Sequence, residues 1–293
     1  MANKSIKIDN RIIGKGEIPF FIAEVGINHN GEIQIAKKLI DAAFATNWDC
    51  VKFQKRTPEI CVPEHQKYLI KETPKGKETY IEYKLRMEFG ESEYNLIDNY
   101  CKQKPILWSA SVWDIPSIDF LLQYNPPFIK IPSAKLTEKD ILIHAAKSNV
   151  LVILSTGMSD YSEIDEAVNI LEKYATGNFI LMYTNSTYPT PHEDINLRII
   201  NLMEERYDCL IGYSGHEYDL EPTVYACVLG VPIIERHITL SHTMWGSDHA
   251  ASLEVHGMDI LRKRIKDINI ILGNGIKKLS EKELEIRKKL RGK

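Results

Sequence analysis

Eight short apolar segments, each followed by an amphipathic stretch, constrain the fold of this chain more than any other feature. The apolar segments are Phe20–Val25, Cys50–Phe53, Ile106–Ser109, Phe128–Ile131, Leu151–Leu154, Phe179–Met182, Cys209–Tyr213 and Val231–Glu235. Helical spacing of apolar residues follows in stretches such as Ile33–Thr46, Ser117–Tyr124, Lys139–Lys147, Tyr161–Tyr174, Leu197–Arg206 and Pro222–Leu229. Strands that alternate with helices are typical of parallel α/β folds. Eight repeats predict a (β/α)8 TIM barrel, because an open doubly wound sheet usually has fewer strands.

Additions to the barrel are expected at both ends and after the second strand. Residues 1–19 are predicted to form an N-terminal β-hairpin extension, since residues 5–18 alternate around Asp9-Asn10. The barrel itself is assigned to residues 20–276, with a last helix at 258–272, and residues 277–293 to a charged helical tail. The insertion 56–104 is predicted to hold a polar loop at 57–76 and helices at 78–89 and 91–104; long loops of this kind are often lids.

Composition excludes several classes of protein. The 293 residues are 44% hydrophobic and 26% charged with a net charge of −3, which favours neither nucleic acid nor an anionic membrane as a partner. The five cysteines contain no C-x-x-C pair, so we expect buried, reduced thiols. No apolar run reaches transmembrane length and the first residues do not resemble a signal peptide. We therefore expect a cytoplasmic protein.

Two histidines follow successive predicted strands. His216 comes after the segment 209–213 and His237 after the segment 231–235. If the strands are parallel neighbours, both imidazoles lie at the carboxyl ends, where such folds carry their sites. A single histidine is as well explained by a hydrogen-bonded structural role. The matched pair indicates a divalent metal site with positions open for substrate.

Other polar residues follow the remaining strands. They are Glu24, Lys52, Gln54, Ser109, Ser111, Lys130, Ser133, Ser155, Thr156, Asn185, Ser186, Tyr188 and Ser214. Lys52 and Lys130 lie inside apolar runs, so each charge needs a partner or a route to solvent. Two lysines among hydroxyl groups favour a small anion that carries phosphate and carboxylate groups. Glu24 could position a water or hydroxyl, and Asp248 could bind sugar hydroxyls.

Four further histidines are assigned no role in this chemistry. His29, His65 and His192 fall in predicted loops and His144 in a predicted helix. We expect all four to be structural or exposed.

Several motifs resemble those of the sialic acid synthase family. They are FIAEVGINHNG at 21–31, VKFQ at 51–54, LSTGMS at 154–159, YPTP at 188–191, ERHITL at 235–240 and DHAASLE at 248–254. The resemblance extends from about Ile18 to Arg291. Several motifs in the same order are far more specific than any single one.

The resemblance implies both an activity and roles for residues. The family condenses phosphoenolpyruvate with N-acetylmannosamine or a related aldose in a TIM barrel, with a divalent metal that is commonly Mn²⁺, with Mg²⁺ or Co²⁺ as alternatives. By resemblance, His216 and His237 are the metal ligands and Glu24 has an acid–base or water-positioning role. Phosphoenolpyruvate would contact Lys52, Ser111, Lys130, Ser133, Ser155, Ser186 and Ser214, and the sugar Gln54, Tyr188 and Asp248.

This chain departs from the family pattern at three places. Ala134-Lys135 replaces a usual Gly-Glu pair, and Lys135 could suit an anionic sugar. Gly215 replaces an Asp that often precedes the first metal histidine. The sequence stops at Lys293, where bacterial members usually continue into an antifreeze-like domain. We therefore expect either a single-domain enzyme with a smaller or differently decorated acceptor, or a separate antifreeze-like domain protein that supplies this part. A homodimer is usual in the family.

Three alternatives to a nonulosonic acid synthase are considered. A related 3-deoxy-ulosonate phosphate synthase would differ in its aldose acceptor, which could be phosphorylated. A barrel that binds sugar or phosphate without catalysis is disfavoured by the complete set of charged residues. A metal hydrolase barrel is disfavoured because the first strand has Glu24, with His29 five residues on, instead of a His-x-His motif.

Overall fold

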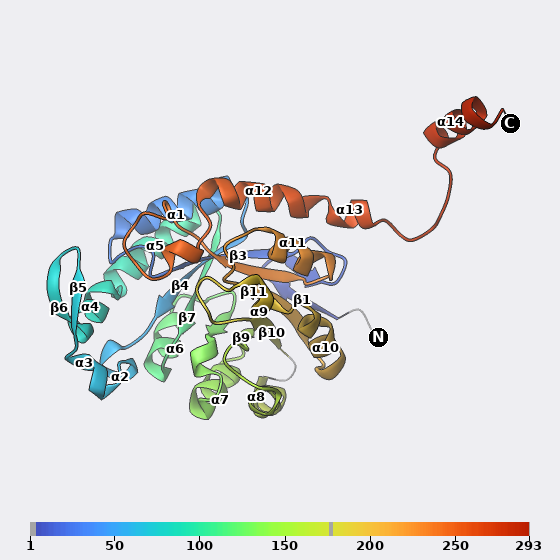
Figure 1. The fold of residues 1–293 in the computed structure, drawn as a ribbon. Helices are drawn as coiled ribbons and strands as arrows, with labels where there is room; N and C mark the ends of the chain where they lie inside the picture. Colours follow the sequence, from blue (N-terminus) through green and yellow to red (C-terminus); the bar gives the residue numbers. More distant parts are fainter. Residues whose placement is uncertain (1–3, 176–177, 293) are drawn as a thin grey trace.

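The fold is a closed barrel of parallel strands inside a ring of helices, which confirms the predicted TIM-barrel class. The structure, a computed structural model, describes residues 4–175 and 178–292. Within this part, eight parallel strands close in chain order, with β12 beside β3 (Figure 1). The strands are β3 (Phe20–Gly26), β4 (Cys50–Lys55), β7 (Leu107–Val112), β8 (Ile129–Ile131), β9 (Val152–Ser155), β10 (Phe179–Thr184), β11 (Leu210–Gly215) and β12 (Ile233–His237). Several strands extend further toward the carboxyl end than predicted, so more polar residues belong to the strands themselves.

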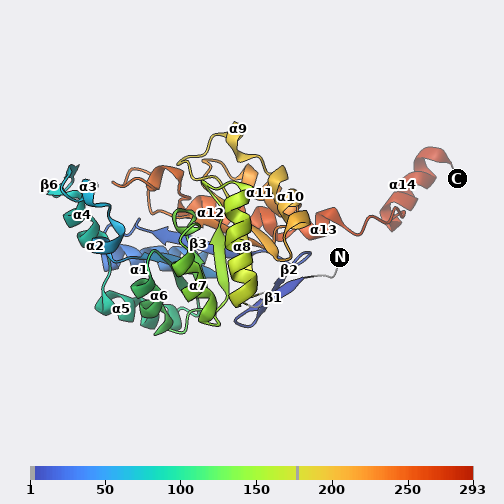
Figure 2. The ribbon, with the colours of Figure 1, turned by 90° about the horizontal axis from the view of Figure 1, so that it is seen from below.

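Helices cover the outside of the barrel (Figures 1 and 2). Those that follow the barrel strands are α1 (Ile33–Ala45), α5 (Glu91–Gln103), α6 (Ile115–Leu122), α7 (Lys139–Lys147), α8 (Tyr161–Ala175), α10 (Arg198–Arg206), α11 (Glu221–Val228) and α12 (Val255–Lys266). In α1, Ala36, Leu39, Ile40 and Ala43 are buried at helical spacing. The helices therefore lie on the strands through the apolar stripes that the sequence indicated.

The strands separate two apolar cores because successive side chains point to opposite faces. In β4, Cys50 belongs to the inner core and Val51 to the outer core beneath the helices. The inner core also includes Phe20, Ile22, Ile153 and Met182. The residue that follows each of these along its strand faces outward and belongs to the outer core. Farther along β4, the next inward position is Lys52. The inside of the barrel thus changes from apolar to charged toward the carboxyl ends.

The insertion after β4 differs from the prediction. Residues 57–76 are not a loop: they contain α2 (Pro58–Cys61), α3 (Glu64–Lys67), β5 (Ile70–Thr73) and the start of β6 (Gly76–Thr79). The sequence Thr73-Pro74-Lys75-Gly76 joins β5 to β6 as a turn, with Pro and Gly at favoured turn positions. The helix predicted at 78–89 is shorter, α4 (Tyr80–Met87), because Thr79 caps it in a capping box with Glu82.

The ends of the chain carry the predicted hairpin and tail. β1 (Ser5–Ile8) and β2 (Arg11–Gly14) form an antiparallel hairpin whose Ile8 and Ile13 join the inner core. The helix predicted at 258–272 is divided into α12 and α13 (Ile268–Leu272) at Asp267. α14 (Glu281–Arg291) is exposed and extends away from the barrel (Figure 1). The predicted domain boundaries remain predictions, and residues 1–3 and 293 lie outside the described residues.

Short α9 (His192–Ile195) and two 3₁₀ helices, η1 (Ser133–Lys135) and η2 (His249–Ala251), occur in the loops at the carboxyl ends of the strands.

All five cysteines are free thiols, as expected, and four of them are buried. In the part of the chain that the structure describes, every helix is too short or too polar to cross a membrane.

Candidate active site

The carboxyl ends of the barrel strands surround a cavity of about 260 Å³. Every residue to which the resemblance assigned a role lines it, with the exception of Asp248, whereas Ser109, Thr156 and Asn185, which also follow predicted strands, do not. These residues are Glu24, Lys52, Gln54, Ser111, Lys130, Ser133, Ser155, Ser186, Tyr188, Ser214, His216 and His237. The cavity is also lined by Trp113, Pro132, Ala134, Met158 and Glu235, which the sequence analysis did not select. Residues far apart in sequence therefore meet at the predicted end of the barrel.

A buried ionic cluster forms the floor of this cavity. The ammonium group of Lys52 lies 2.5 Å from Glu24 Oε2 and 3.6 Å from Glu235 Oε1. Lys130 donates to both carboxylate oxygens of Glu235 at 3.0 Å. All four side chains are at most 5% exposed. Each buried lysine thus has the carboxylate partner that its burial requires.

Burial shifts the proton affinities of the carboxylates in opposite directions. Desolvation raises the pKa of Glu24 to about 7, because the attraction of Lys52 offsets only part of it. Burial would also raise the pKa of Glu235, but the charges of Lys130 and Lys52 outweigh this effect and lower it. At neutral pH, Glu235 is therefore ionised, whereas Glu24 can gain or lose a proton.

The two lysines respond differently to the same surroundings. Burial by itself would lower the pKa of Lys52, but Glu235 and Glu24 raise it above its ordinary value. Burial lowers the pKa of Lys130, since Glu235 only partly compensates the loss of solvation.

Glu235 is the central residue that sequence reasoning missed. It joins the two lysines, which come from β4 and β8, and it accepts a hydrogen bond of 3.3 Å from Ser214. A signal was available, because Glu235 lies two residues before His237 and therefore faces inward on the same strand. The sequence analysis placed Glu235 at the end of a predicted strand and assigned it no role.

Hydroxyl groups line the wall beside Lys130. The backbone N–H of Gly157 donates to Ser133 Oγ at 3.0 Å. A Cβ on Gly157 would lie 2.2 Å from Ser186 Oγ and 2.9 Å from Ser133 Oγ. Only glycine allows these three groups to converge, and their small polar atoms are suited to phosphate oxygens. Lys52 donates to Ser111 Oγ, and Ser111 is the register partner of Lys130 on the neighbouring strand.

His216 and His237 lie side by side at the carboxyl ends of the neighbouring strands β11 and β12. Their ring centroids are 5.4 Å apart. His216 Nδ1 lies 2.6 Å from the carbonyl oxygen of Asn185 and must donate to it, which leaves the Nε2 lone pair for the hydroxyl of Tyr188 at 3.0 Å. Burial lowers the pKa of His216 to about 3 and that of His237 to about 4. Both rings are neutral at pH 7, the form that binds metal ions.

The histidine pair fits an open metal site. His237 Nδ1 is buried without a hydrogen-bond partner, and Asp248 Oδ2 lies 3.9 Å from it. Among the described residues, no third His, Cys, Asp or Glu groups with this pair into a complete protein ligand set. Two neutral imidazoles would therefore hold a divalent cation with several positions left for water or substrate.

The residues assigned to the sugar lie around His237. A Cβ on Gly26 would lie 3.2 Å from Glu24, 3.3 Å from Gln54 and 3.4 Å from His237, so these side chains converge on one point. Tyr188 stacks on His216 with centroids 4.0 Å apart. Asp248 lies near His237 but does not itself line the cavity.

A second buried ion pair lies on the outer face of β11 and β12. Arg236 Nη1 donates to Glu217 Oε1 at 2.8 Å and to Thr223 at 2.9 Å, while Tyr213 donates to Glu217 Oε2 at 2.9 Å. A Cβ on Gly215 would lie 2.3 Å from the Glu217 carboxylate. The departure noted at Gly215 is therefore explained, since a larger residue would displace Glu217.

Other residues considered in the sequence lie outside the cavity. Lys135 is 3.7 Å from Glu138 and does not line the cavity, so its place in the structure does not support a contact with the sugar. His29 is buried and stacks on Phe89 with centroids 3.9 Å apart, a structural role. His144 pairs with Asp119 on the surface.

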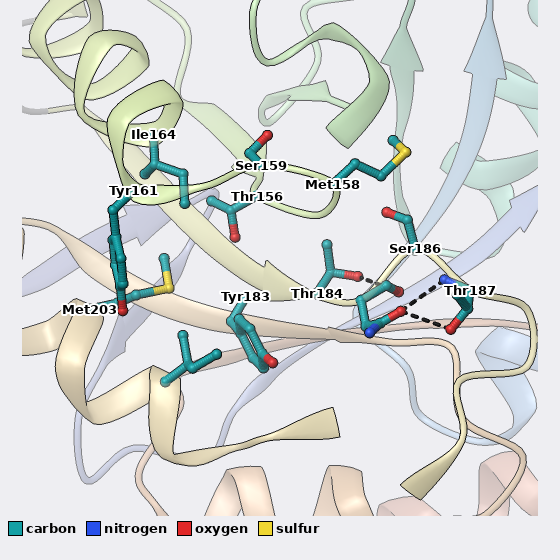
Figure 3. A pocket seen from close by; sticks show the side chains of 12 residues that line it. Thr156, Met158, Ser159, Tyr161, Ile164, Tyr183, Thr184, Ser186, Thr187 and Met203 are labelled. Carbon is teal, nitrogen blue, oxygen red and sulfur yellow. Dashed lines mark hydrogen bonds between the residues drawn. The ribbon is translucent and has the colours of Figure 1, made fainter. Parts of the chain in front are cut away.

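A neighbouring cavity of about 320 Å³ shares Met158 and Ser186 with the first (Figure 3). It lies over the carboxyl ends of β9 and β10, and Figure 3 shows Tyr183 and Met203 at the end away from Met158. The residues that line it include no carboxylate, lysine or histidine. The larger cavity thus lacks the ionisable groups of the charged one.

Comparisons of the sequence and of the structure with known proteins point to the same family. The sequence profile of the NeuB family matches residues 39–277. N,N'-diacetyllegionaminic acid synthase of Campylobacter jejuni is 34% identical over 267 residues, which cover 89% of this chain and 80% of that protein. N-acetylneuraminate-9-phosphate synthase of Homo sapiens is 34% identical over 284 residues, which cover 96% and 78%.

A solved structure is similar over the same extent. The crystal structure of N-acetylneuraminic acid (sialic acid) synthetase from Leptospira borgpetersenii, in complex with citrate, has a TM-score of 0.86 and 32% identity. The similarity covers 99% of both chains. The fold and the motifs thus have counterparts over nearly the whole sequence.

Proposed function

The chain belongs to the NeuB family, and we propose that it condenses phosphoenolpyruvate with an amino sugar or related aldose to give a nonulosonic acid and phosphate. Family membership makes it a synthase that forms a carbon–carbon bond. One observation carries the finer proposal: two buried lysines, held by Glu24 and Glu235, line one cavity with two neutral histidines.

The lysines supply the positive charge for phosphoenolpyruvate. Lys52 and Lys130 are fixed by Glu235 before the ligand arrives, so little reorganisation is needed on binding. The hydroxyls of Ser133 and Ser186, which converge beside Gly157, would donate to phosphate oxygens. Substrate binding therefore uses charge and polar groups already in place.

The histidines would hold the metal. A divalent cation between His216 and His237 would act as a Lewis acid on the aldehyde oxygen of the acceptor. His216 is oriented by its hydrogen bond to Asn185, and Tyr188 lies against it. Asp248 and Gln54 would orient the sugar hydroxyls beside this pair.

The reaction needs one carbon–carbon bond and one water. C3 of phosphoenolpyruvate attacks the aldehyde carbon, and the aldehyde oxygen takes the proton of protonated Glu24 to become a hydroxyl. Water adds to the cationic C2, and Glu24, with its pKa raised to about 7, accepts the proton of that water. The tetrahedral intermediate expels inorganic phosphate as the C2 hydroxyl becomes the ketone. Atoms and charge balance without an oxidant or reductant.

Phosphate release tests the proposal. Mixing the protein with phosphoenolpyruvate, Mn²⁺ and N-acetylmannosamine, mannose, their 6-phosphates or diacetamido hexoses should release phosphate with at least one sugar, and a chelator should stop it. His237→Ala should abolish release while the barrel stays folded. His192→Ala, on the rim and paired with Asp219 at 3.0 Å, is the matched control and should be fully active. Full activity of His237→Ala would overturn the role of this histidine.

A further inference from the structure

Three cations of the insertion gather where it meets the cavity. The ammonium of Lys71 lies 4.4 Å from the centroid of the Tyr83 ring and that of Lys84 lies 5.2 Å from it. The guanidinium of Arg56 lies 4.2 Å from the centroid of Trp113, which lines the cavity. We call Arg56, Lys71 and Lys84 the basic cluster.

The basic cluster lacks the partners that neighbouring cations have. Within the insertion, Lys55 pairs with Glu88, Lys77 with Glu72, and Arg86 with Glu78. By contrast, none of the ion pairs formed among the described residues includes a member of the basic cluster. Like charges held together without an ion-pair partner are unfavourable in the protein alone and favour an anionic ligand.

Proton affinities agree with this crowding. Burial, with the charges of Arg56 and Lys71, lowers the pKa of Lys84 to about 8, and Asp248 opposes this only in part. Lys84 still carries a proton in most molecules at neutral pH. An anion bound beside it would raise its pKa again.

The basic cluster borders both sides of the acceptor end of the cavity. Arg56 donates a hydrogen bond to the side chain of Gln54, one of the lining residues. On the other side, Tyr83 packs edge-on against Trp245 with centroids 5.5 Å apart, and Lys71 lies 5.7 Å from the Trp245 centroid. Trp245 belongs to the loop that carries Asp248. The insertion therefore places its cations between the two residues assigned to the sugar.

We propose that the basic cluster binds a phosphate group on the acceptor sugar, so that the acceptor of this synthase is a sugar phosphate ester. A phosphate ester carries close to two negative charges at pH 7 and has three oxygens that accept from Arg and Lys. With the aldehyde beside His237, the far end of the sugar extends past Gln54 toward the insertion. This inference rests on the proposed function and specifies its acceptor.

A purely structural role is the competing interpretation. Lys71 and Lys84 stack on Tyr80 and Tyr83, and such contacts stabilise a fold whether or not a ligand binds. The two interpretations differ in one measurable respect. A structural role changes stability and all acceptors alike, whereas a phosphate contact changes phosphorylated acceptors selectively.

The experiment compares kcat/KM for N-acetylmannosamine and N-acetylmannosamine 6-phosphate with phosphoenolpyruvate and Mn²⁺. We expect the 6-phosphate to be preferred by the natural protein. Lys71→Met and Lys84→Met should each reduce kcat/KM for the 6-phosphate roughly 10- to 100-fold more than for the free sugar, mainly through KM, as for a lost charge-assisted hydrogen bond far from the reacting atoms. Lys77→Met removes one charge from the same hairpin and should leave kcat/KM for both sugars unchanged, because Lys77 already pairs with Glu72.

Calorimetric binding of the two sugars separates this inference from the proposed function. Equal or better turnover of the free sugar by the natural protein would overturn the basic cluster as a phosphate site and leave the synthase reaction standing. No turnover of either sugar, with tighter binding of the 6-phosphate that Lys84→Met abolishes, would support the basic cluster and count against the synthase. Equal loss for both sugars in Lys84→Met would establish the structural role instead.

Discussion

Two buried ionic clusters lie on opposite faces of β11 and β12, and they differ in the groups that complete their hydrogen bonds and ion pairs. Outside the barrel, Glu217 and Arg236 are each 0% exposed, and the carboxylate accepts from the guanidinium, Thr223 and Tyr213. Arg236 Nη2 donates further to the backbone carbonyl of Glu217. Inside the barrel, Glu235 binds two lysines, but the cluster borders an open cavity. Protein groups surround the outer pair and satisfy all of it except Arg236 Nε, which is buried without a partner, whereas the inner cluster faces a cavity that can hold a ligand.

The difference shows how one short sequence can serve structure and chemistry together. Glu235, Arg236 and His237 are consecutive, and the strand period of two sends the first and third inward and the second outward. In the same way, His216 faces the cavity while Glu217 binds Arg236 behind it. The outer ion pair thus links the two strands immediately beside both histidines. It can position them without touching substrate.

The largest expected effect tests the inner cluster. Glu24→Gln removes the group that accepts a proton and should lower kcat roughly 100- to 10,000-fold. At pH 5, where the raised pKa keeps Glu24 protonated in the folded protein, Gln has the shape of the side chain it replaces, so the free energy of unfolding should change by less than about 1 kcal/mol. Phosphate-release kinetics and urea denaturation measure the two quantities. Loss of stability in proportion to loss of activity would show that the inner cluster is as structural as the outer one.

The next effect tests the outer pair. Arg236→Met leaves the Glu217 carboxylate buried without its cation and should lower the free energy of unfolding by about 3–5 kcal/mol. Tyr213→Phe removes one neutral hydrogen bond to the same carboxylate and should cost about 1 kcal/mol. Thermal or chemical denaturation of both variants provides the comparison. If Arg236→Met folded with the stability of the natural protein, the contrast between the clusters would fail.

The smallest effect is a pH dependence that belongs to the inner cluster alone. The pKa of Glu24 rises from 4.5 to about 7 on folding, so the folded protein binds this proton more tightly than the unfolded chain. Its contribution to stability is complete below pH 4.5 and is lost as the pH rises through about 7. Relative to Glu24→Gln, the natural protein without metal should lose on the order of 1–3 kcal/mol between about pH 5 and 8. Denaturation of both proteins in chelator measures this difference, and parallel curves would contradict the raised pKa.

Most residues that line the charged cavity could be predicted from local patterns, whereas the ion pairs between them could not. Lys52 and Lys130 stood out because each interrupts an apolar run, and His216 and His237 because each follows one. The contact of Lys130 with Glu235 joins residues 105 positions apart, and no local pattern encodes it. The hairpin β5–β6 was missed for a similar reason. Its strands are polar and exposed, so their alternation leaves little hydrophobic signal.

The sequence by itself determined the barrel and the direction in which its polar residues face. Strand periodicity depends on neighbours in the chain, so a run such as 50–54 specifies which side chains point inward before the fold forms. Only the tertiary structure decided which inward charges meet, that Glu217 and Arg236 pair behind the histidines, and that the insertion brings Lys71 to the loop of Asp248. These contacts depend on closure of the barrel and on the packing of Tyr83 against Trp245, which bring together segments that share no local pattern.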